Sequence, residues 1–331
     1  MILHTPWDGT QNNLMKVKSY FLFLSNFLPL HKIKLSGIKI ITYHGVYKDE
    51  LSNERWIPPH FVKLSEFEKQ MRYISRYFKP VNLRDAVKAL KSGSFSSKMI
   101  VVTFDDGYAN NFYLALPILK KFSIPATIFL VTKYIINQDL FPFDKIRLLN
   151  YWGVKDIGMT AYLNSPISQL NYQLSQIWPK YKHFLQKKQW ETFCPLTIEE
   201  IRKMKSTGLI EFGAHTHSHC ILKNESRDTR KKEIAISVKR VKEITGQYEV
   251  SFSYPNGQVG DFDKEDKLYV KSLCYCAVSG ISGSNFDIND LFQLKRYSIG
   301  LYHFIGHFKL EITGIKQEIL KLLKILGYGQ K

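Results

Sequence analysis

Two short apolar runs in this chain end directly in residues that can bind a metal ion. Met99–Val102 leads into Thr-Phe-Asp-Asp-Gly at 103–107, and Leu209–Gly213 leads into His-Thr-His-Ser-His at 215–219. Short apolar runs of this kind are typical of buried strands, and α/β folds build their chemistry at the carboxyl ends of such strands. The pattern therefore favours an α/β fold in which both polar segments lie at one edge of a sheet.

These two polar segments supply the donor atoms of a metal-hydrolase site. One carboxylate and two imidazoles give three protein ligands for a divalent ion and leave a position open for water. The second carboxylate of the Asp105–Asp106 pair can then take the proton of that water. Taken singly, an Asp-Asp pair also fits a solvated turn or helix cap, and a His-x-x-x-His spacing also arises by chance. The conjunction of the two, each after a predicted strand, favours the metal site.

The rest of the chain alternates predicted strands with amphipathic helices. Such alternation indicates parallel strands in a barrel-like or doubly wound sheet. Strands are expected at about 38–43, 98–104, 126–131, 250–253 and 275–278, and helices at about 64–77, 83–90, 110–122, 227–245, 265–273 and 314–327. Pro117 is expected to kink the helix over 110–122. Thr197 and Glu200 have the spacing of a capping box at a helix start.

This rhythm stops between residues 137 and 193, where the sequence becomes aromatic and polar. We interpret this stretch as an insertion between units of the core. Its aromatic side chains suit two roles equally well, the wall of a substrate groove or the core of a helical subdomain.

Four cysteines, at positions 194, 220, 274 and 276, are too few for a disulfide scaffold and are expected to be reduced.

A formal net charge of +18 predicts attraction to polyanions such as anionic lipid or an acidic glycan. The lysines are spread over predicted helices and no nucleic-acid-binding module is present, so no nucleic acid partner is expected.

Residues 1–37 contain a Phe- and Leu-rich stretch flanked by lysines. We interpret it as an amphipathic helix that packs on the domain or lies on an anionic membrane, and the alternative is an export or anchor signal. The expected location is the cytoplasm, with peripheral contact at the inner membrane face; the alternative is an exported or membrane-anchored protein.

Several motifs of the chain resemble the signature blocks of the polysaccharide deacetylases, the NodB-homology group of carbohydrate esterases. The resemblance runs over residues 38–305 and leaves a C-terminal helix at 306–331. It rests on Thr-Phe-Asp-Asp-Gly at 103–107, His-Thr-x-x-His at 215–219 and Phe-Ser-Tyr-Pro-Asn-Gly at 252–257, with supporting segments at 41–46, 115–119, 124–130 and 294–299. It implies an irregular (β/α) barrel, to which the sequence pattern adds an N-terminal helix, a helical insertion and a C-terminal helix.

The resemblance also implies a chemistry. Asp106, His215 and His219 would hold one divalent ion, zinc first, with cobalt, nickel, iron or manganese as alternatives, and Asp105 would be the general base. The enzyme would remove N-acetyl or O-acetyl groups from a glycan or a lipid-linked glycan precursor. The alternatives are hydrolysis of a non-sugar amide or cyclic imide on the same fold, and a glycan-binding protein without activity.

Other family roles transfer less directly. The backbone amide around Asn256 matches an oxyanion donor, and Tyr254 belongs to the same substrate-binding block. Ser253 stands where the family commonly has an arginine that orients the base. Arg296 either replaces that arginine or pairs with a surface carboxylate. His44, at the end of the first strand, is the candidate general acid or substrate contact.

Overall fold

The computed structural model describes residues 37–313 of the chain. The chain divides into two compact units, one formed by Ser36–Leu301 and the other by Met1–Leu35 together with Tyr302–Lys331. The described part of the second unit contains helix α13, Ile305–Ile312. The expected helices within residues 1–37 and 314–327 lie outside the described residues. The fold and the site described below belong to the first unit.

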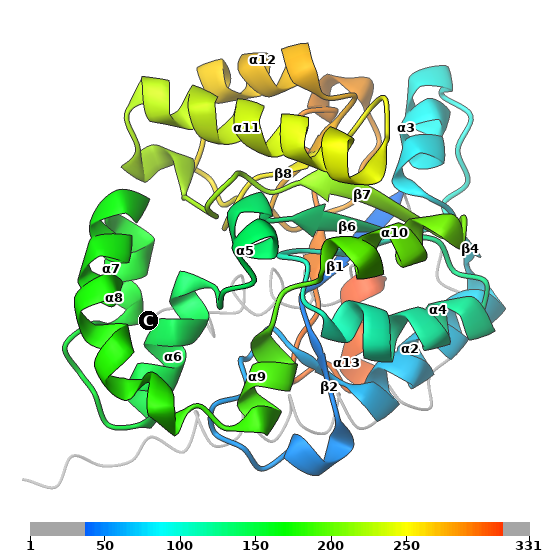
Figure 1. Ribbon diagram of the computed structural model, residues 1–331. Helices are drawn as coiled ribbons and strands as arrows, with labels where there is room; N and C mark the ends of the chain where they lie inside the picture. The colour runs from blue at the N-terminus through cyan, green and yellow to red at the C-terminus, as the bar shows by residue number, and fades with distance from the viewer. Residues whose placement is uncertain (1–36, 314–331) are drawn as a thin grey trace, which may run out of the picture. The chain divides into compact units, whose positions relative to one another are not determined.

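The first unit is built on a curved parallel sheet (Figure 1). Its strands follow the order β10-β1-β5-β6-β7-β8-β9, and β4 also pairs with β5; β2 and β3 form a separate parallel pair. The strands are β1 (Lys39–Tyr43), β2 (Val46–Tyr47), β3 (Val62–Lys63), β4 (Lys79–Pro80), β5 (Met99–Phe104), β6 (Ala126–Leu130), β7 (Ile210–Ala214), β8 (Phe252–Ser253), β9 (Ala277–Val278) and β10 (Tyr297–Ser298). A bridge between Val278 and Leu294 brings β9 next to the segment before β10, so the sheet wraps round on itself.

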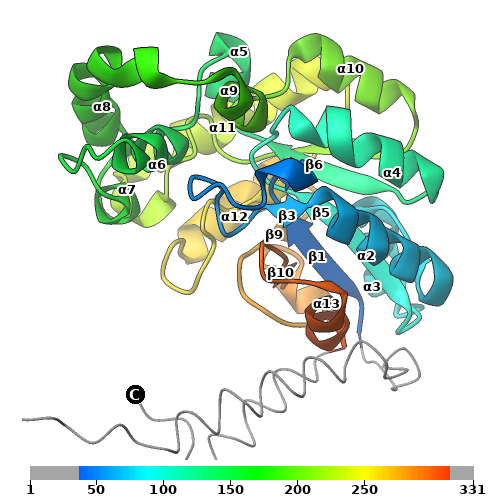
Figure 2. The same cartoon turned by 90° about the horizontal axis from the view of Figure 1, so that it is seen from below.

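Helices cover the outside of this sheet, as the view in Figure 2 shows for α2, α3, α4, α10, α11 and α12. The helices of the first unit are α2 (Leu64–Tyr77), α3 (Leu83–Ser92), α4 (Leu116–Lys121), α5 (Thr132–Asn137), α6 (Pro142–Tyr151), α7 (Met159–Asn164), α8 (Ile167–Tyr181), α9 (Lys187–Phe193), α10 (Ile198–Ser206), α11 (Arg227–Thr245) and α12 (Lys264–Leu273). The fold confirms the predicted irregular (β/α) barrel. No helix among residues 37–313 combines the length and the apolar character needed to cross a membrane.

Most of the predicted elements are present, and their differences have local causes. The helices predicted at 64–77 and 227–245 have those bounds, and Thr197 and Glu200 form the predicted capping box of α10. The helix predicted over 110–122 is divided: a π-helical turn, Asn111–Ala115, precedes α4. Pro117 has no backbone N–H to bond the preceding turn, which explains the irregularity at this point. The four cysteines are free thiols, and all but Cys194 are buried.

Parallel register places the ends of the central strands at one edge of the sheet. Phe104 pairs with Ile128, and Leu130 pairs with Ala214, so the residues that follow β5, β6 and β7 emerge side by side. Helices α6, α7 and α8 of the insertion gather on the side of the molecule toward which β6 and β7 point (Figure 1). The fold therefore brings the Asp-Asp pair, the histidine segment and the insertion together.

Candidate metal centre

Asp106, His215 and His219 converge at the edge where β5 and β7 end. The three residues are buried, and one candidate ligand atom from each lies within 4.8 Å of the other two. The backbones of Asp106 and His219 are left-handed, with φ of 72° and 59°. This conformation is costly for residues other than glycine and is concentrated at functional sites. It turns the Asp106 side chain away from that of its neighbour Asp105, so the two carboxylates face different partners.

Hydrogen bonds from neighbouring residues orient both imidazoles. His215 Nδ1 lies 2.7 Å from the carbonyl oxygen of Ser253. Because a carbonyl oxygen can only accept a hydrogen bond, Nδ1 carries the proton, and Nε2 of the neutral ring keeps its lone pair. Burial lowers the pKa of His215 to about 4, so this ring is neutral at neutral pH. His219 Nδ1 is hydrogen-bonded to the Tyr162 hydroxyl. Both Nε2 atoms therefore remain directed at Asp106.

The donor set fits a divalent cation. Asp106 Oδ1 is buried without a well-aligned hydrogen bond, and it lies 3.0 Å from His219 Nε2 and 3.6 Å from His215 Nε2. Burial acts to raise the pKa of Asp106, but the neighbouring histidines, His219 foremost, lower it to about 2. An ionised carboxylate beside two imidazole lone pairs is the ligand combination that zinc and several other divalent transition metals accept.

Asp105 points to the other side of the turn and forms a bidentate ion pair with Arg296. Arg296 Nη1 donates to Asp105 Oδ1 at 2.8 Å, and Nη2 donates to Oδ2 at 2.7 Å, with both side chains buried. Burial acts to raise the pKa of Asp105, but the charge of Arg296 and then that of His215 outweigh this effect and hold the pKa well below its ordinary value. Asp105 is therefore an ionised carboxylate held in one orientation.

The position of Arg296 resolves the alternative left open by the sequence. Its remaining donors reach the hydroxyl groups of Thr42, Thr103 and Ser253 and the carbonyl oxygen of Ser279. Ser253 stands where the family resemblance leads one to expect an arginine, and its hydroxyl accepts a hydrogen bond from Arg296, the residue that precedes β10. The partner of Arg296 is the candidate base, and a surface carboxylate is not involved.

Two histidines share the wall of the same cavity. His44 follows β1 and His60 precedes β3, and their rings lie 4.6 Å apart between centroids. The pairing of Val46 with Val62 explains this neighbourhood, because each histidine stands two residues before a member of that pair. His44 Nδ1 and His60 Nε2 are buried without a hydrogen-bond partner among the described residues. Burial, followed by the influence of His44, lowers the pKa of His60 well below its ordinary value. His60 was not predicted from the sequence, because β2 and β3 are only two residues long and leave no recognisable pattern.

The Tyr-Pro-Asn-Gly block contributes one of its two predicted residues to the cavity. Asn256 lines it in a left-handed conformation, and its side-chain amide is occupied by Asp261 at 2.6 Å. Tyr254 does not line it: the ring is buried against Phe262, and its hydroxyl donates to the carbonyl oxygen of Phe292. The structure therefore places the Tyr254 side chain outside the cavity, and the left-handed backbone of Asn256 interrupts the extended segment between the two residues.

The cavity above the metal ligands has a volume of about 340 Å³ and is partly built by the insertion. Phe143, Arg147, Met159 and Tyr162 all line it, although none of them belongs to a motif recognised in the sequence. Trp152 and Trp178 instead stack on each other with centroids 5.7 Å apart. The insertion thus lines the cavity and also packs aromatic side chains of its own against each other. His217, between the two ligand histidines, turns away and its Nδ1 lies 2.9 Å from the Thr132 hydroxyl.

Comparison with known proteins agrees with this geometry. The family model described as Polysaccharide deacetylase matches residues 92–275. A poly-beta-1,6-N-acetyl-D-glucosamine N-deacetylase of Staphylococcus aureus (strain MSSA476) is 25% identical over 256 residues, which covers 72% of this chain and 70% of that protein. The Streptococcus pyogenes deacetylase PplD in complex with acetate superposes with a TM-score of 0.60 at 18% identity, covering 84% of this chain and 99% of that one. A de-N-acetylase from Aggregatibacter actinomycetemcomitans gives a TM-score of 0.56 at 17% identity, covering 83% and 99%.

Fold and relatives together define a hydrolase that acts on carbon–nitrogen bonds other than peptide bonds. The family model covers more than half of the chain, and its match contains the Asp-Asp pair and the histidine segment. The chain belongs to the polysaccharide deacetylase family.

Proposed function

We propose that this protein is a metal-dependent deacetylase that removes N-acetyl groups from an amino-sugar glycan. The observation that carries the proposal is the convergence of Asp106, His215 and His219 beside the ionised Asp105–Arg296 pair, at the base of a cavity. The staphylococcal relatives are named poly-beta-1,6-N-acetyl-D-glucosamine N-deacetylases, and this name supports an acetylated glucosamine polymer as the substrate class. Free and lipid-linked forms of such a glycan both fit this proposal.

A divalent ion held by these three side chains would polarise the acetyl oxygen and lower the pKa of a water molecule toward about 7. Asp105 would accept the proton of the attacking water as general base. Arg296 keeps Asp105 ionised and fixes both of its oxygens, so the base does not need to reorganise during the reaction.

Two further groups complete the proposed reaction. Among the hydrogen bonds of the described residues, none uses the backbone N–H of Asn256 as a donor, so this group is available to the developing oxyanion. His44 lines the cavity from the end of β1 and is the candidate donor of the proton that the departing amine requires. His60, packed beside it, limits the orientations that the His44 ring can take.

Acetate release from acetylated oligosaccharides tests the proposal. Oligomers of N-acetylglucosamine with β-1,6 and β-1,4 linkages are offered to protein loaded with zinc, cobalt or manganese. Release is expected to stop with a chelator and to return when metal is restored. A protein that holds the metal and releases no acetate from any N-acetylated sugar would contradict the proposal, and release from O-acetylated sugars alone would replace it by an esterase activity.

A further inference from the structure

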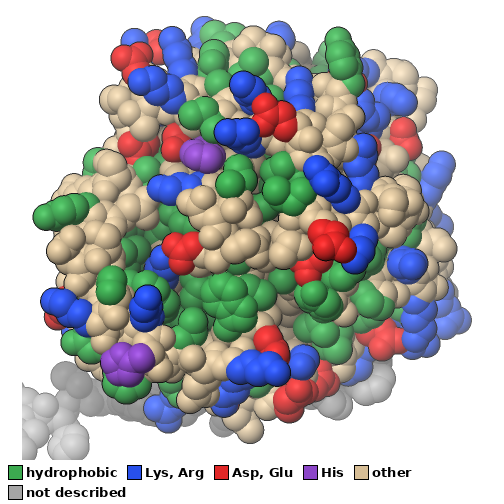
Figure 3. All heavy atoms as spheres, in the orientation of Figure 1, with side chains coloured by type: hydrophobic (Ala, Val, Ile, Leu, Met, Phe, Trp, Pro, Cys, Tyr) green, Lys and Arg blue, Asp and Glu red, His purple; other side chains and the backbone are tan. Residues whose placement is uncertain are grey.

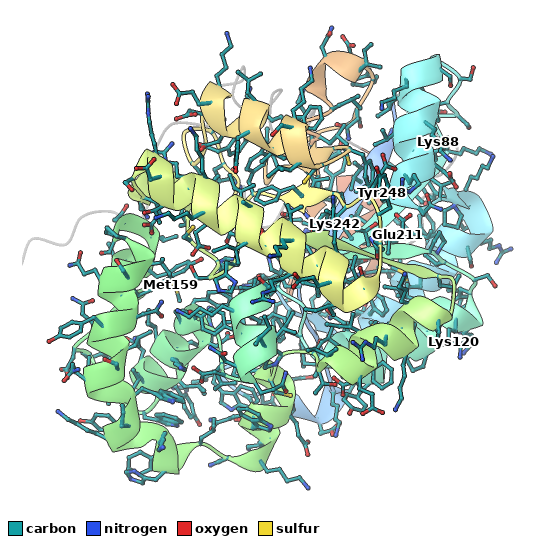
Figure 4. The ribbon with its side chains drawn as sticks, turned by 45° about the horizontal axis from the view of Figure 1, so that its top comes forward. Lys88, Lys120, Met159, Glu211, Lys242 and Tyr248 are labelled. Carbon is teal, nitrogen blue, oxygen red and sulfur yellow. The ribbon has the colours of Figure 1, made fainter. Side chains whose placement is uncertain are left out.

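A second cavity adjoins the catalytic one on the side of the insertion. It has a volume of about 540 Å³ and is lined by Arg55, Ile146, Arg147, Asn150, Tyr151 and Met159. Arg147 and Met159 also line the catalytic cavity, so the two spaces meet at these side chains. Figure 4 shows Met159 on the insertion side of the molecule, far from Glu211 at the start of β7. A glycan bound at the metal ligands would extend past Met159 into this second space, whose volume is in the range of about 300–1,000 Å³ usual for ligand sites.

The arginines of this cavity have no protein partner. Neither the Arg55 nor the Arg147 side chain forms an ion pair or a hydrogen bond within residues 37–313. Arg55 is exposed, whereas Arg147 Nε is buried without an acceptor. A buried donor left unpaired is destabilising, and an acceptor supplied by a bound ligand would satisfy it. In contrast, Arg296 in the same cavity system has its donors occupied by protein oxygens.

The nearby carboxylates are committed to other groups. Asp144, one turn before Arg147 on α6, accepts from the Tyr108 hydroxyl at 2.8 Å and lies beyond ion-pair distance of Arg147. Burial raises the pKa of Asp144 well above its ordinary value, which favours its neutral form. Glu54, next to Arg55 in the sequence, is engaged by Lys188 and by the Trp56 ring N–H. The cavity therefore has two guanidinium groups and no carboxylate that neutralises them.

We propose that this cavity is a subsite for an anionic group of the glycan, a carboxylate or a phosphate carried near the acetylated sugar. A guanidinium binds either group through two parallel hydrogen bonds, which a neutral sugar hydroxyl cannot match. Tyr151, half exposed at the rim, and Met159 supply apolar surface for the adjoining sugar ring. This inference rests on the proposed deacetylase function and adds a substrate class to it.

The test compares three acetylated glucosamine trimers that differ in one terminal group: neutral, 6-phosphorylated, or oxidised to a 6-carboxylate. Acetate release is measured with wild type, Arg147→Met, Arg147→Lys and, as a matched control on the exposed face of α10, Arg202→Met. Wild type and Arg202→Met are expected to prefer an anionic trimer in kcat/KM by about tenfold or more. Arg147→Met is expected to lose that preference, and Arg147→Lys to keep part of it because the charge remains. Preference for only one of the two anionic trimers identifies the anion.

Direct binding separates this inference from the proposed function. Kd values for the three trimers are measured on metal-loaded Asp105→Asn protein, with and without Arg147→Met, and thermal melting with metal content verifies that each variant is folded. Turnover of the neutral trimer without any anionic preference in wild type overturns the subsite and leaves the deacetylase intact. An equal loss of kcat on all three trimers in Arg147→Met also overturns it, because Arg147 would then act on the reaction itself. Metal-loaded protein that turns over none of the trimers argues against the proposed function.

Discussion

Single residues at this site are defined by the hydrogen-bond partners that surround them. Asp105 and Asp106 are neighbours in the chain, yet one faces a guanidinium and the other faces two imidazoles. That difference separates the proposed base from the proposed metal ligand, and each assignment can be tested separately.

Replacement of either ligand histidine is expected to remove metal and activity together. In His215→Ala or His219→Ala, only two of the three protein ligands remain, so metal content after dialysis should fall well below one ion per chain, with loss of acetate release. His217→Ala is the matched control from the same segment, because its ring is bonded to Thr132 away from the site. Full metal occupancy in both ligand variants would show that the ion is bound elsewhere.

Asp105→Asn is expected to retain the metal and to lose on the order of 10²-fold or more in kcat, the usual scale for a general base. The amide keeps the shape of the side chain but cannot accept the proton of water. Metal content and kcat are measured on the same preparation. Turnover close to that of wild type would assign the base role to another group.

Arg296→Met is expected to shift the acidic limb of the pH–rate profile. In wild type the pKa of Asp105 lies below its ordinary 3.8, so the base is ionised throughout the neutral range. Without the arginine, burial raises that pKa, the base is protonated as the pH falls, and the acidic limb of kcat/KM should move upward by about 1–3 pH units. Arg296→Lys restores the charge without the bidentate geometry and should shift less. An unchanged profile in Arg296→Met would contradict the role given to the ion pair.

At the scale of elements, the sequence predicted the parts of the site that follow regular strands. Asp105, Asp106, His215 and His219 come directly after β5 and β7, and parallel register brings such positions together. His60, Arg147 and Tyr162 were not predicted, because they belong to very short strands or to an insertion without strand-helix rhythm. Their placement depends on how these segments pack on the barrel, which periodicity does not encode.

Tyr162 gives the insertion a testable part in metal binding. Its hydroxyl is hydrogen-bonded to His219 Nδ1 and thereby fixes the orientation of that ring. Tyr162→Phe keeps the packing against Phe143 and is expected to weaken metal affinity by about 10–100-fold, measured by competition with a chromogenic chelator. Tyr172→Phe, an exposed tyrosine of the same insertion, is the control. Equal affinities in the two variants would reduce Tyr162 to a packing residue.

At the scale of the whole molecule, the basic charge is distributed widely. Figure 3 shows Lys and Arg side chains over much of one face, interspersed with acidic groups, and they do not gather into one tract. Many of them pair with carboxylates of the same helix, as Lys203 does with Glu199. The formal net charge of +18 over the full chain therefore produces a positive electrostatic potential that is spread over the surface and attracts anionic membranes and substrates.

We propose that this charge and the Phe- and Leu-rich N-terminal segment together hold the protein at an anionic membrane surface. Deletion of residues 1–34 is expected to reduce salt-sensitive binding to vesicles containing anionic lipid, at about 1 kcal/mol per basic residue removed from the surface. Cosedimentation with anionic and neutral vesicles measures this, and metal content verifies that the barrel is retained. Binding that is unchanged by the deletion, or secretion with a processed N-terminus, would contradict this location.

The ion pair between Asp105 and Arg296 joins two parts of the chain that are far apart in the sequence. The family match ends at residue 275, and every ligand of the proposed metal centre precedes that point, but the guanidinium is delivered from β10, which pairs with β1 at the opposite end of the chain. In a chain that lacks residue 296, the proposed base would have no cation beside it. We therefore expect a protein shortened before β10 to release no acetate, even when its candidate metal ligands are all present.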